Sequence, residues 1–172
     1  MLTICDAETY LQYMKDDPVR PNLFGDDTAR FRDKFYVFAD VDEDDKTVNA
    51  ILCAVLSPFV IQTEELLRAI SEDYQSMQEL EASIRGILDD KNIATILTPY
   101  SLWSYRKGSG KKLINELLDF IPLNFPRVTH VITMSPPTKM AMLFHTGNGA
   151  RLLSPNSETI NYEYRLANVT LH

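Results

Sequence analysis

Residues 98–118 read TPYSLWSYRKGSGKKLINELL, and this stretch decides the fold. An apolar, β-prone run over residues 93–103 leads into Arg106-Lys107-Gly108-Ser109-Gly110. Apolar residues at helical spacing follow from Leu113 to Ile121. The sequence therefore predicts a strand, a glycine-rich turn and a helix in direct succession.

The glycine-rich turn has the features of an anion-binding site. Gly108 and Gly110 allow the backbone to turn tightly and to aim successive N–H groups at one point, where the helix dipole also places its positive end. Arg106, Lys107 and Lys111 add positive charge there. The pattern is neither a P-loop nor the Gly-x-Gly-x-x-Gly dinucleotide fingerprint. Such turns also occur without a ligand, so the residues predict either an anion site, most naturally for a phosphate group, or a solvated basic turn.

The composition indicates one acidic globular domain. The chain has 172 residues, 45% of them hydrophobic and 24% charged, with a formal net charge of −7 and a pI near 4.9. We expect residues 1–172 to form a single domain whose hydrophobic core is stable without disulfides or a structural metal. A general nucleic-acid binder needs a basic surface, so we expect no nucleic-acid partner and a compact anion at the basic turn.

The cysteines and the apolar runs bear on the cellular compartment. Cys5 and Cys53 are the only cysteines, and no disulfide framework or metal-spaced cluster occurs. No secretion signal and no apolar run as long as a membrane span is found in the sequence. We therefore expect a cytoplasmic protein with no metal and no membrane partner. The acidic run over residues 40–45 lacks the ligand order of an EF-hand loop and is predicted to be a solvated turn.

The order of the other elements indicates an α/β (α+β) protein with a mixed sheet flanked by helices. Upstream of the central stretch, we predict a strand at residues 1–5, a helix over 7–15, a hairpin of residues 35–40 and 48–59, and a helical insertion over 62–89. We expect the central helix to end before Pro122. Beyond it, we predict a strand at residues 127–134, a helix at 138–145, and strands over 152–153 and 159–167.

This order resembles the acyl-CoA-using Gcn5-related N-acetyltransferase (GNAT) superfamily, whose phosphate loop reads Arg/Gln-x-x-Gly-x-Gly/Ala. Here the loop is YRKGSG, in which both glycines match and either Tyr105 or Arg106 takes the Arg/Gln position. The superfamily's last helix usually reads Ala-x-x-Phe/Leu-Tyr-x-x-x-Gly-Phe. Residues 141–150 read AMLFHTGNGA, with His145 in place of the Tyr. The resemblance implies a GNAT-like, mostly antiparallel sheet with a helical insertion before the central strand.

A narrower resemblance is to the catalytic half of malonyl-CoA decarboxylase. In that family a strand ending in Ser-Pro and a later His-x-x-Asn-Gly-Ala carry the chemistry. The matching residues here are Ser135 and His145, and Asn148 completes the motif as a substrate-binding residue. The large N-terminal helical domain of the family and the long insertion between its Ser and His have no counterpart in this sequence.

The superfamily resemblance implies how an acyl-CoA would bind. The loop from Arg106 to Lys111 would hold the pyrophosphate by backbone N–H groups and cations. Tyr100, Ser101 and Leu102 would line the pantetheine arm and offer an N–H to the thioester oxygen.

The implied chemistry centres on the histidine. In an acyl transfer, His145 would act as general acid on the leaving thiolate, and because an unperturbed imidazole titrates near neutral pH, we expect it to switch protonation there. In a decarboxylation, Ser135 would fix the carboxylate or the thioester oxygen while His145 protonates the enolate carbon.

Three functions therefore stay open. The first is an acyltransferase that uses acetyl-CoA, another acyl-CoA or a phosphopantetheine carrier as donor and an unidentified small molecule or protein as acceptor. The second is decarboxylation of a malonyl thioester. The third is a catalytically silent acyl-CoA-binding or interaction domain.

Overall fold

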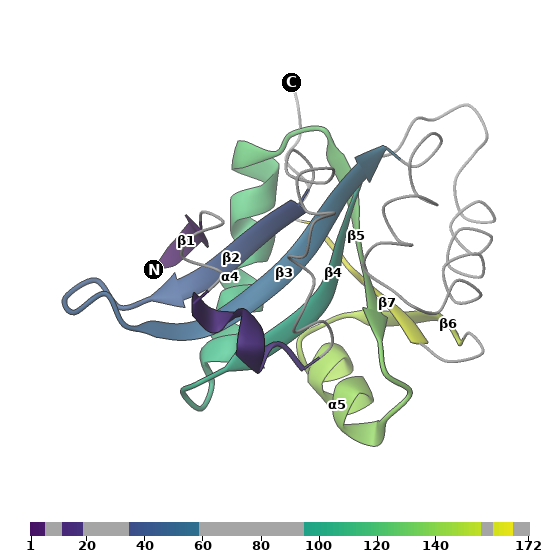
Figure 1. The fold of residues 1–172 in the computed structure, drawn as a ribbon. Helices are drawn as coiled ribbons and strands as arrows, with labels where there is room; N and C mark the ends of the chain where they lie inside the picture. The colour runs from purple at the N-terminus through teal and green to yellow at the C-terminus, as the bar shows by residue number, and fades with distance from the viewer. Residues whose placement is uncertain (6–11, 19–34, 59–94, 156–159, 167–172) are drawn as a thin grey trace.

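A seven-stranded, mostly antiparallel sheet organises the chain in the computed structural model (Figure 1). The structure describes residues 1–5, 12–18, 35–58, 95–155 and 160–166. The strands follow the spatial order β1-β2-β3-β4-β5-β7-β6, and β4 and β5 are the parallel pair among them. Their bounds are β1 Leu2–Cys5, β2 Phe35–Val41, β3 Val48–Pro58, β4 Thr95–Ser104, β5 Val128–Ser135, β6 Arg151–Pro155 and β7 Ile160–Tyr164.

Helices cover both faces of this sheet. Helix α4, Ser109–Asn124, lies behind the sheet in Figure 1, and the 3₁₀ turn η1, Met14–Asp16, lies in front of it. Helix α5, Lys139–Gly147, follows β5. The predicted hairpin, the central strand–turn–helix and the last strands are confirmed. The predicted insertion over residues 62–89 and most of the predicted helix over 7–15 lie outside the described residues. No helix in the described part of the chain is both long and apolar enough to cross a membrane.

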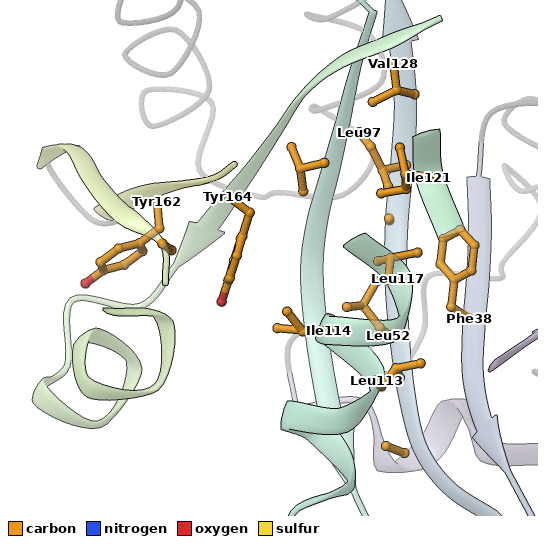
Figure 2. Packing of buried hydrophobic residues seen from close by; sticks show 14 residues of the cluster. Phe38, Leu52, Leu97, Leu113, Ile114, Leu117, Ile121, Val128, Tyr162 and Tyr164 are labelled. Carbon is orange, nitrogen blue, oxygen red and sulfur yellow. The ribbon is translucent and has the colours of Figure 1, made fainter. Parts of the chain in front are cut away.

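The core lies between α4 and the sheet. Leu113, Ile114, Leu117 and Ile121 fall on one face of α4 because they recur at spacings of three and four, and all are buried. They pack against apolar side chains of the central strands, among them Phe38, Leu52 and Leu97 (Figure 2). Burial of each large aliphatic side chain is worth about 1.5–3 kcal/mol. This packing fixes where α4 begins relative to β4.

The end of α4 differs from the prediction. The helix does not stop before Pro122 but continues to Asn124, with Pro122 inside it. Proline lacks the N–H that would bond the carbonyl four residues earlier. The last turn persists because the N–H of Phe125 donates to the Ile121 carbonyl at 2.7 Å and the Asn124 side chain donates to the Phe120 carbonyl at 2.9 Å.

The acidic run divides into a solvated turn and one buried carboxylate. Residues 43–47 are exposed, as predicted, whereas Asp40 is 1% exposed. Its Oδ1 accepts from Lys112 Nζ at 2.6 Å and lies 3.1 Å from the Met1 ammonium. Burial alone would raise the pKa of Asp40, but the hydrogen bonds and charges of these two cations outweigh it, and the net pKa is lowered. The ion pair joins β2 to the first turn of α4.

Two leucines of α4 test this packing. We expect Leu117→Ala to lower the free energy of unfolding by about 3 kcal/mol, because Leu117 is 2% exposed and its truncation leaves a cavity. Leu123→Ala should change it by less than about 0.5 kcal/mol, because Leu123 is 77% exposed. Urea unfolding followed by circular dichroism measures both. Equal losses in the two variants would contradict the described orientation of α4.

Candidate active site

The parallel strands β4 and β5 separate part-way along their length. Their register pairs are Thr95 with Val128, Ile96 with His130 and Leu97 with Val131, and pairing ends there. Strand β4 continues to Ser104 and β5 to Ser135, and the two spread apart (Figure 1). The backbone edge of β4 beyond Leu97 is therefore not used by β5, so an extended chain with amide groups can hydrogen-bond to it.

A bulge marks the free part of β4. Cys53 of β3 pairs with Ser101 and Ala54 pairs with Pro99, so Tyr100 is an extra residue in β4. Pro99 has no N–H to donate, and a bulge is where a strand tolerates this. The Ser101 hydroxyl donates to Asp17 Oδ1 at 2.6 Å, in a buried contact. The Ser101 side chain is thus bound to Asp17, and Ser101 is in register with Cys53 of β3.

The glycine-rich loop leads into α4 as predicted. Gly108 is the residue before the helix and has a φ of 87°, which L side chains rarely adopt, and no side chain caps the first turn of α4. The N–H groups of Tyr105 and Arg106 both donate to the Asn49 carbonyl, at 2.8 and 3.3 Å, which anchors the loop to β3. An uncapped first turn after such a loop can bind an anion.

The side chain of Tyr105 points away from this anion site. Its hydroxyl donates to Asp16 Oδ2 at 2.7 Å and accepts from Trp103 Nε1 at 3.0 Å. Burial, which outweighs the Trp103 hydrogen bond, raises the pKa of Tyr105 to about 12, and Asp16 adds to the rise. Both candidates for the Arg/Gln position of the loop pattern are exposed, but the Tyr105 hydroxyl is occupied by Asp16 and Trp103, which leaves Arg106 as the candidate that can contact an anion.

The charges around the loop are mixed. A cavity of about 640 Å³ on its β2–β3 side is lined by carboxylates of the acidic turn and by Arg106 and Lys107. Lys112 is held by Asp40. The cations left for an anion at the start of α4 are thus Arg106, Lys107 and Lys111, which are all exposed.

The loop and α5 border the same part of β4. A Cβ on Gly110 would lie 3.7 Å from Leu102 Cδ2 of β4 and 4.0 Å from Phe144 Cε2 of α5. Phe144 immediately precedes His145 in the chain. The start of α4 and the end of α5 therefore converge where β4 and β5 have separated.

Local sequence fixes both ends of α5. The Thr138 hydroxyl accepts from the Ala141 N–H at 3.2 Å and caps the start. At the other end the Ala150 N–H donates to the His145 carbonyl, the Gly149 N–H donates to the Thr146 carbonyl, and Gly149 has a φ of 89°. These are the two bonds and the left-handed residue of a Schellman motif. The Asn-Gly-Ala part of the quoted motif thus ends the helix that carries His145.

Asn148 has a capping role in this helix end. Its Nδ2 donates to the Phe144 carbonyl at 2.8 Å. Its Oδ1 is buried and has no hydrogen-bond partner among the described residues. The side chain therefore contributes to the end of α5, and its role in substrate binding stays a prediction.

The structure brings Ser135 and His145 together. Ser135 is the last residue of β5, and its Oγ lies 2.8 Å from His145 Nε2. The other ring nitrogen, Nδ1, lies 2.7 Å from the hydroxyl of Tyr164 on β7. The His145 ring also stacks on Tyr162, with centroids 4.8 Å apart and planes at 25°. Figure 2 shows both tyrosines to one side of the leucines that pack under α4.

Burial sets the protonation of this group. Desolvation lowers the pKa of His145 to about 4 and raises the pKa of the Tyr164 hydroxyl. The expectation that His145 switches protonation near neutral pH is therefore wrong, because its surroundings disfavour the imidazolium. At pH 7 the imidazole is neutral and has one N–H donor and one acceptor nitrogen.

Tyr164 is the site residue that the sequence did not identify. Tyr162 and Tyr164 are two apart on a strand and so share a face of the sheet. This alternation indicates that the two rings lie together, but not which side chain meets them. Register supplies that information, because Thr133 of β5 pairs with Tyr162 and Ser135 pairs with Ile160.

The chain is similar in structure to known acyl-transferring enzymes, although its sequence matches no family model. No protein-family model matches it, and no curated protein matches it. It is similar to Arabidopsis thaliana NAA60 in complex with acetyl-CoA, with a TM-score of 0.61 and 15% identity over 95% of this chain and 97% of that one. It is also similar to Drosophila melanogaster polyamine N-acetyltransferase, with a TM-score of 0.59 and 10% identity over 96% and 100% of the two chains. FeeM, an N-acyl amino acid synthase from uncultured soil microbes, is similar with a TM-score of 0.58 and 10% identity over 96% and 90%.

These similarities establish the GNAT fold for this chain, as the sequence motifs implied. They extend over nearly the full length of both chains in each comparison, so the similarity covers the fold as a whole. The narrower resemblance to malonyl-CoA decarboxylase is not shown by them.

Two glycines of the loop should respond to alanine with opposite signs. Gly108→Ala should lower the free energy of unfolding by about 1–2 kcal/mol, because a Cβ is strained at a φ of 87°. Gly110→Ala should be neutral or raise it by up to about 1 kcal/mol, because the new Cβ meets its nearest neighbour at 3.7 Å and alanine favours helix. Thermal and urea unfolding measure both. A stable Gly108→Ala protein would contradict the described loop conformation.

The pKa of His145 has consequences for stability. Between the unfolded value near 6.5 and the folded value of about 4, the unfolded chain binds a proton that the folded protein does not. Stability should therefore fall as the pH is lowered through this window, by up to about 3 kcal/mol for this group. His145→Gln removes this contribution, so the wild-type protein should lose more stability than the variant between pH 7 and 4.5. NMR titration of the ring gives the pKa directly, and a value near 6.5 would refute the prediction.

Proposed function

We propose that the protein is an acyl-CoA-dependent acyltransferase that binds the donor between the separated strands β4 and β5. The observation that carries the proposal is the convergence, at that separation, of an uncapped, cation-bearing helix start on one side and the Ser135–His145 pair on the other. An acyl-CoA has the matching parts, namely a pyrophosphate, an arm with two amides and a thioester.

Each part of the donor has a counterpart in the chain. Backbone N–H groups at the start of α4, with Arg106, Lys107 and Lys111, would bind the pyrophosphate. The edge of β4 around Tyr100 to Leu102, beyond its pairing with β5, would pair with the pantetheine amides and offer an N–H to the thioester oxygen. Two of the similar structures are named for N-acetyl transfer or N-acyl amino acid synthesis, which supports this reading of the site.

The reaction then follows from the positions of these groups. An acceptor nucleophile attacks the thioester carbonyl carbon, the new bond to the acyl group forms, and the carbon–sulfur bond breaks. Negative charge passes through the carbonyl oxygen, near the β4 edge, to the departing sulfur. His145, neutral at pH 7, would donate a hydrogen bond from its ring N–H to that sulfur, and the proton that the acceptor releases would pass to the thiolate or to solvent.

Decarboxylation of a malonyl thioester is the second candidate. The 2.8 Å contact between Ser135 Oγ and His145 Nε2 favours it, because the malonyl-CoA decarboxylase resemblance places its chemistry on these two residues. Here the carbon–carbon bond to the carboxylate breaks, carbon dioxide leaves, and the enolate carbon takes a proton.

One experiment separates these functions from a silent binding domain. The protein is incubated with acetyl-CoA or malonyl-CoA, with and without a panel of amines, and the products are identified by mass. Free CoA with an acylated amine supports transfer, and conversion of malonyl-CoA to acetyl-CoA supports decarboxylation. His145→Ala should lower turnover at least about tenfold and leave CoA binding unchanged. Binding without turnover would refute both enzymatic proposals.

The binding half of the proposal has its own test. CoA should raise the thermal unfolding temperature, since a ligand of the folded state stabilises it. Arg106→Ala combined with Lys107→Ala should weaken CoA binding about 10- to 100-fold, because charge-assisted hydrogen bonds to phosphate are lost. Lys46→Ala is the matched control, since Lys46 is exposed in the β2–β3 turn outside the loop. Equal binding by all three proteins would refute the phosphate site.

A further inference from the structure

Four side chains of β5, α5 and β7 form one hydrogen-bonded row. Thr133 Oγ1 lies 3.3 Å from Ser135 Oγ, Ser135 Oγ lies 2.8 Å from His145 Nε2, and His145 Nδ1 lies 2.7 Å from Tyr164 Oη. Each hydroxyl has one proton, and the neutral imidazole has one N–H. Fixing the direction of the hydrogen bond at either end therefore fixes it throughout the row.

The sheet end of the row is compatible with one direction. When the Thr133 hydroxyl donates to the Tyr162 carbonyl, 3.4 Å away, its oxygen is free to accept the proton of Ser135. Ser135 Oγ has then used its proton and must accept from His145 Nε2. The imidazole proton accordingly lies on Nε2.

The tyrosine end gives the same direction independently. Tyr164 is 3% exposed, and two described side chains engage its hydroxyl. The Asn148 amide acts as a donor, because its hydrogen bond opposes the rise in the pKa of Tyr164, and His145 Nδ1, 2.7 Å away, is then the acceptor for the hydroxyl proton. A buried donor left without an acceptor costs about as much as a lost hydrogen bond, so the hydroxyl proton points at Nδ1. Nδ1 is then the acceptor nitrogen, and Nε2 again carries the proton.

We propose that Tyr164 is a positioning residue that holds His145 in the tautomer with its proton on Nε2, directed toward Ser135. The catalytic effect of this tautomer rests on the proposed function, acyl transfer from an acyl-CoA. His145 then offers a preset N–H to the charge that develops on the thioester sulfur, and a departing thiolate competes with Ser135 for it. Because the pKa of His145 is about 4, the ring acts as a neutral donor at pH 7 and needs no prior protonation.

The neighbouring tyrosine provides a matched control. Tyr162 lies two residues away on the same strand, and it is also fully buried. Its hydroxyl has no hydrogen-bond partner among the described residues, although its ring stacks on His145. Tyr162→Phe and Tyr164→Phe thus remove the same atom from the same strand, and only the second removes a partner of the imidazole.

The test is the tautomer of His145, read from the ¹⁵N shifts of the ring nitrogens in histidine-labelled protein at pH 7 without CoA. Wild-type protein and Tyr162→Phe should both show protonated Nε2. Tyr164→Phe should show a mixture of the two tautomers. A wild-type ring protonated on Nδ1, or an unchanged tautomer in Tyr164→Phe, would overturn the proposal. The wild-type measurement stands even if a variant fails to fold.

Kinetics then connect the tautomer to the reaction. Tyr164→Phe should lower kcat for acyl transfer about 10- to 100-fold, the usual scale for loss of a group that orients an active-site histidine, with the KM for acyl-CoA nearly unchanged. A raised KM with unchanged kcat would overturn the positioning role. If His145 has the expected tautomer but the protein transfers no acyl group, the proposed function is refuted. The assignment of Tyr164 as the group that orients His145 would still hold.

Discussion

The site depends on one constraint, which is that parallel pairing between β4 and β5 ends after Leu97 and Val131. Before that point the two strands form a closed, buried sheet. After it, each strand bonds to its outer neighbour, β4 to β3 and β5 to β7, and among the described strands the facing edges do not pair with each other. The backbone groups of a sheet edge inside a protein normally need hydrogen-bond partners. The proposed donor site lies at these edges because an extended ligand can supply such partners.

Helices α4 and α5 lie at the two ends of the candidate site, α4 at the glycine-rich loop and α5 at His145. Helix α4 is fixed by the leucines and isoleucines of the core and by the ion pair of Lys112 with Asp40. Helix α5 has no buried residue of its own, and its position depends on its end caps and on the contacts of Phe144 and His145. Strong packing therefore supports the loop end of the site, whereas hydrogen bonds support the histidine end. Substitutions at the second end should affect chemistry more than overall stability.

Sequence patterns predicted the parts of the structure that local chemistry determines. The strand–glycine–helix succession and the hairpin around an acidic turn follow from spacing and turn residues. The buried state of Asp40 did not, because its cation Lys112 is far away in the chain and reaches it only when α4 packs on β2. The prediction that α4 ends before Pro122 is wrong for a related reason. Tertiary packing and the hydrogen bond from the Phe125 N–H to the Ile121 carbonyl retain a last turn that proline alone disfavours.

The candidate site shows the same division. Ser135, His145 and the glycine loop were recognisable as motifs, because each lies on a short stretch with its own pattern. The partner of His145 was not, because Tyr164 reaches Nδ1 through the register of β7 on β5, which no local pattern encodes. The pKa of the imidazole is likewise a property of burial by three elements and not of the residue type.

The exchange of tyrosine for histidine in the last helix has a structural consequence. In the superfamily pattern that this chain resembles, a tyrosine stands at this helix position. Here an imidazole takes that position, and a phenol, Tyr164, stands behind it on β7. A lone neutral imidazole could present either a lone pair or an N–H to the cleft, whereas a phenol in hydrogen-bond contact with Nδ1 removes that choice. In the proposed arrangement, His145 and Tyr164 together present one N–H donor. Ser135 accepts from this N–H until a thiolate competes for it.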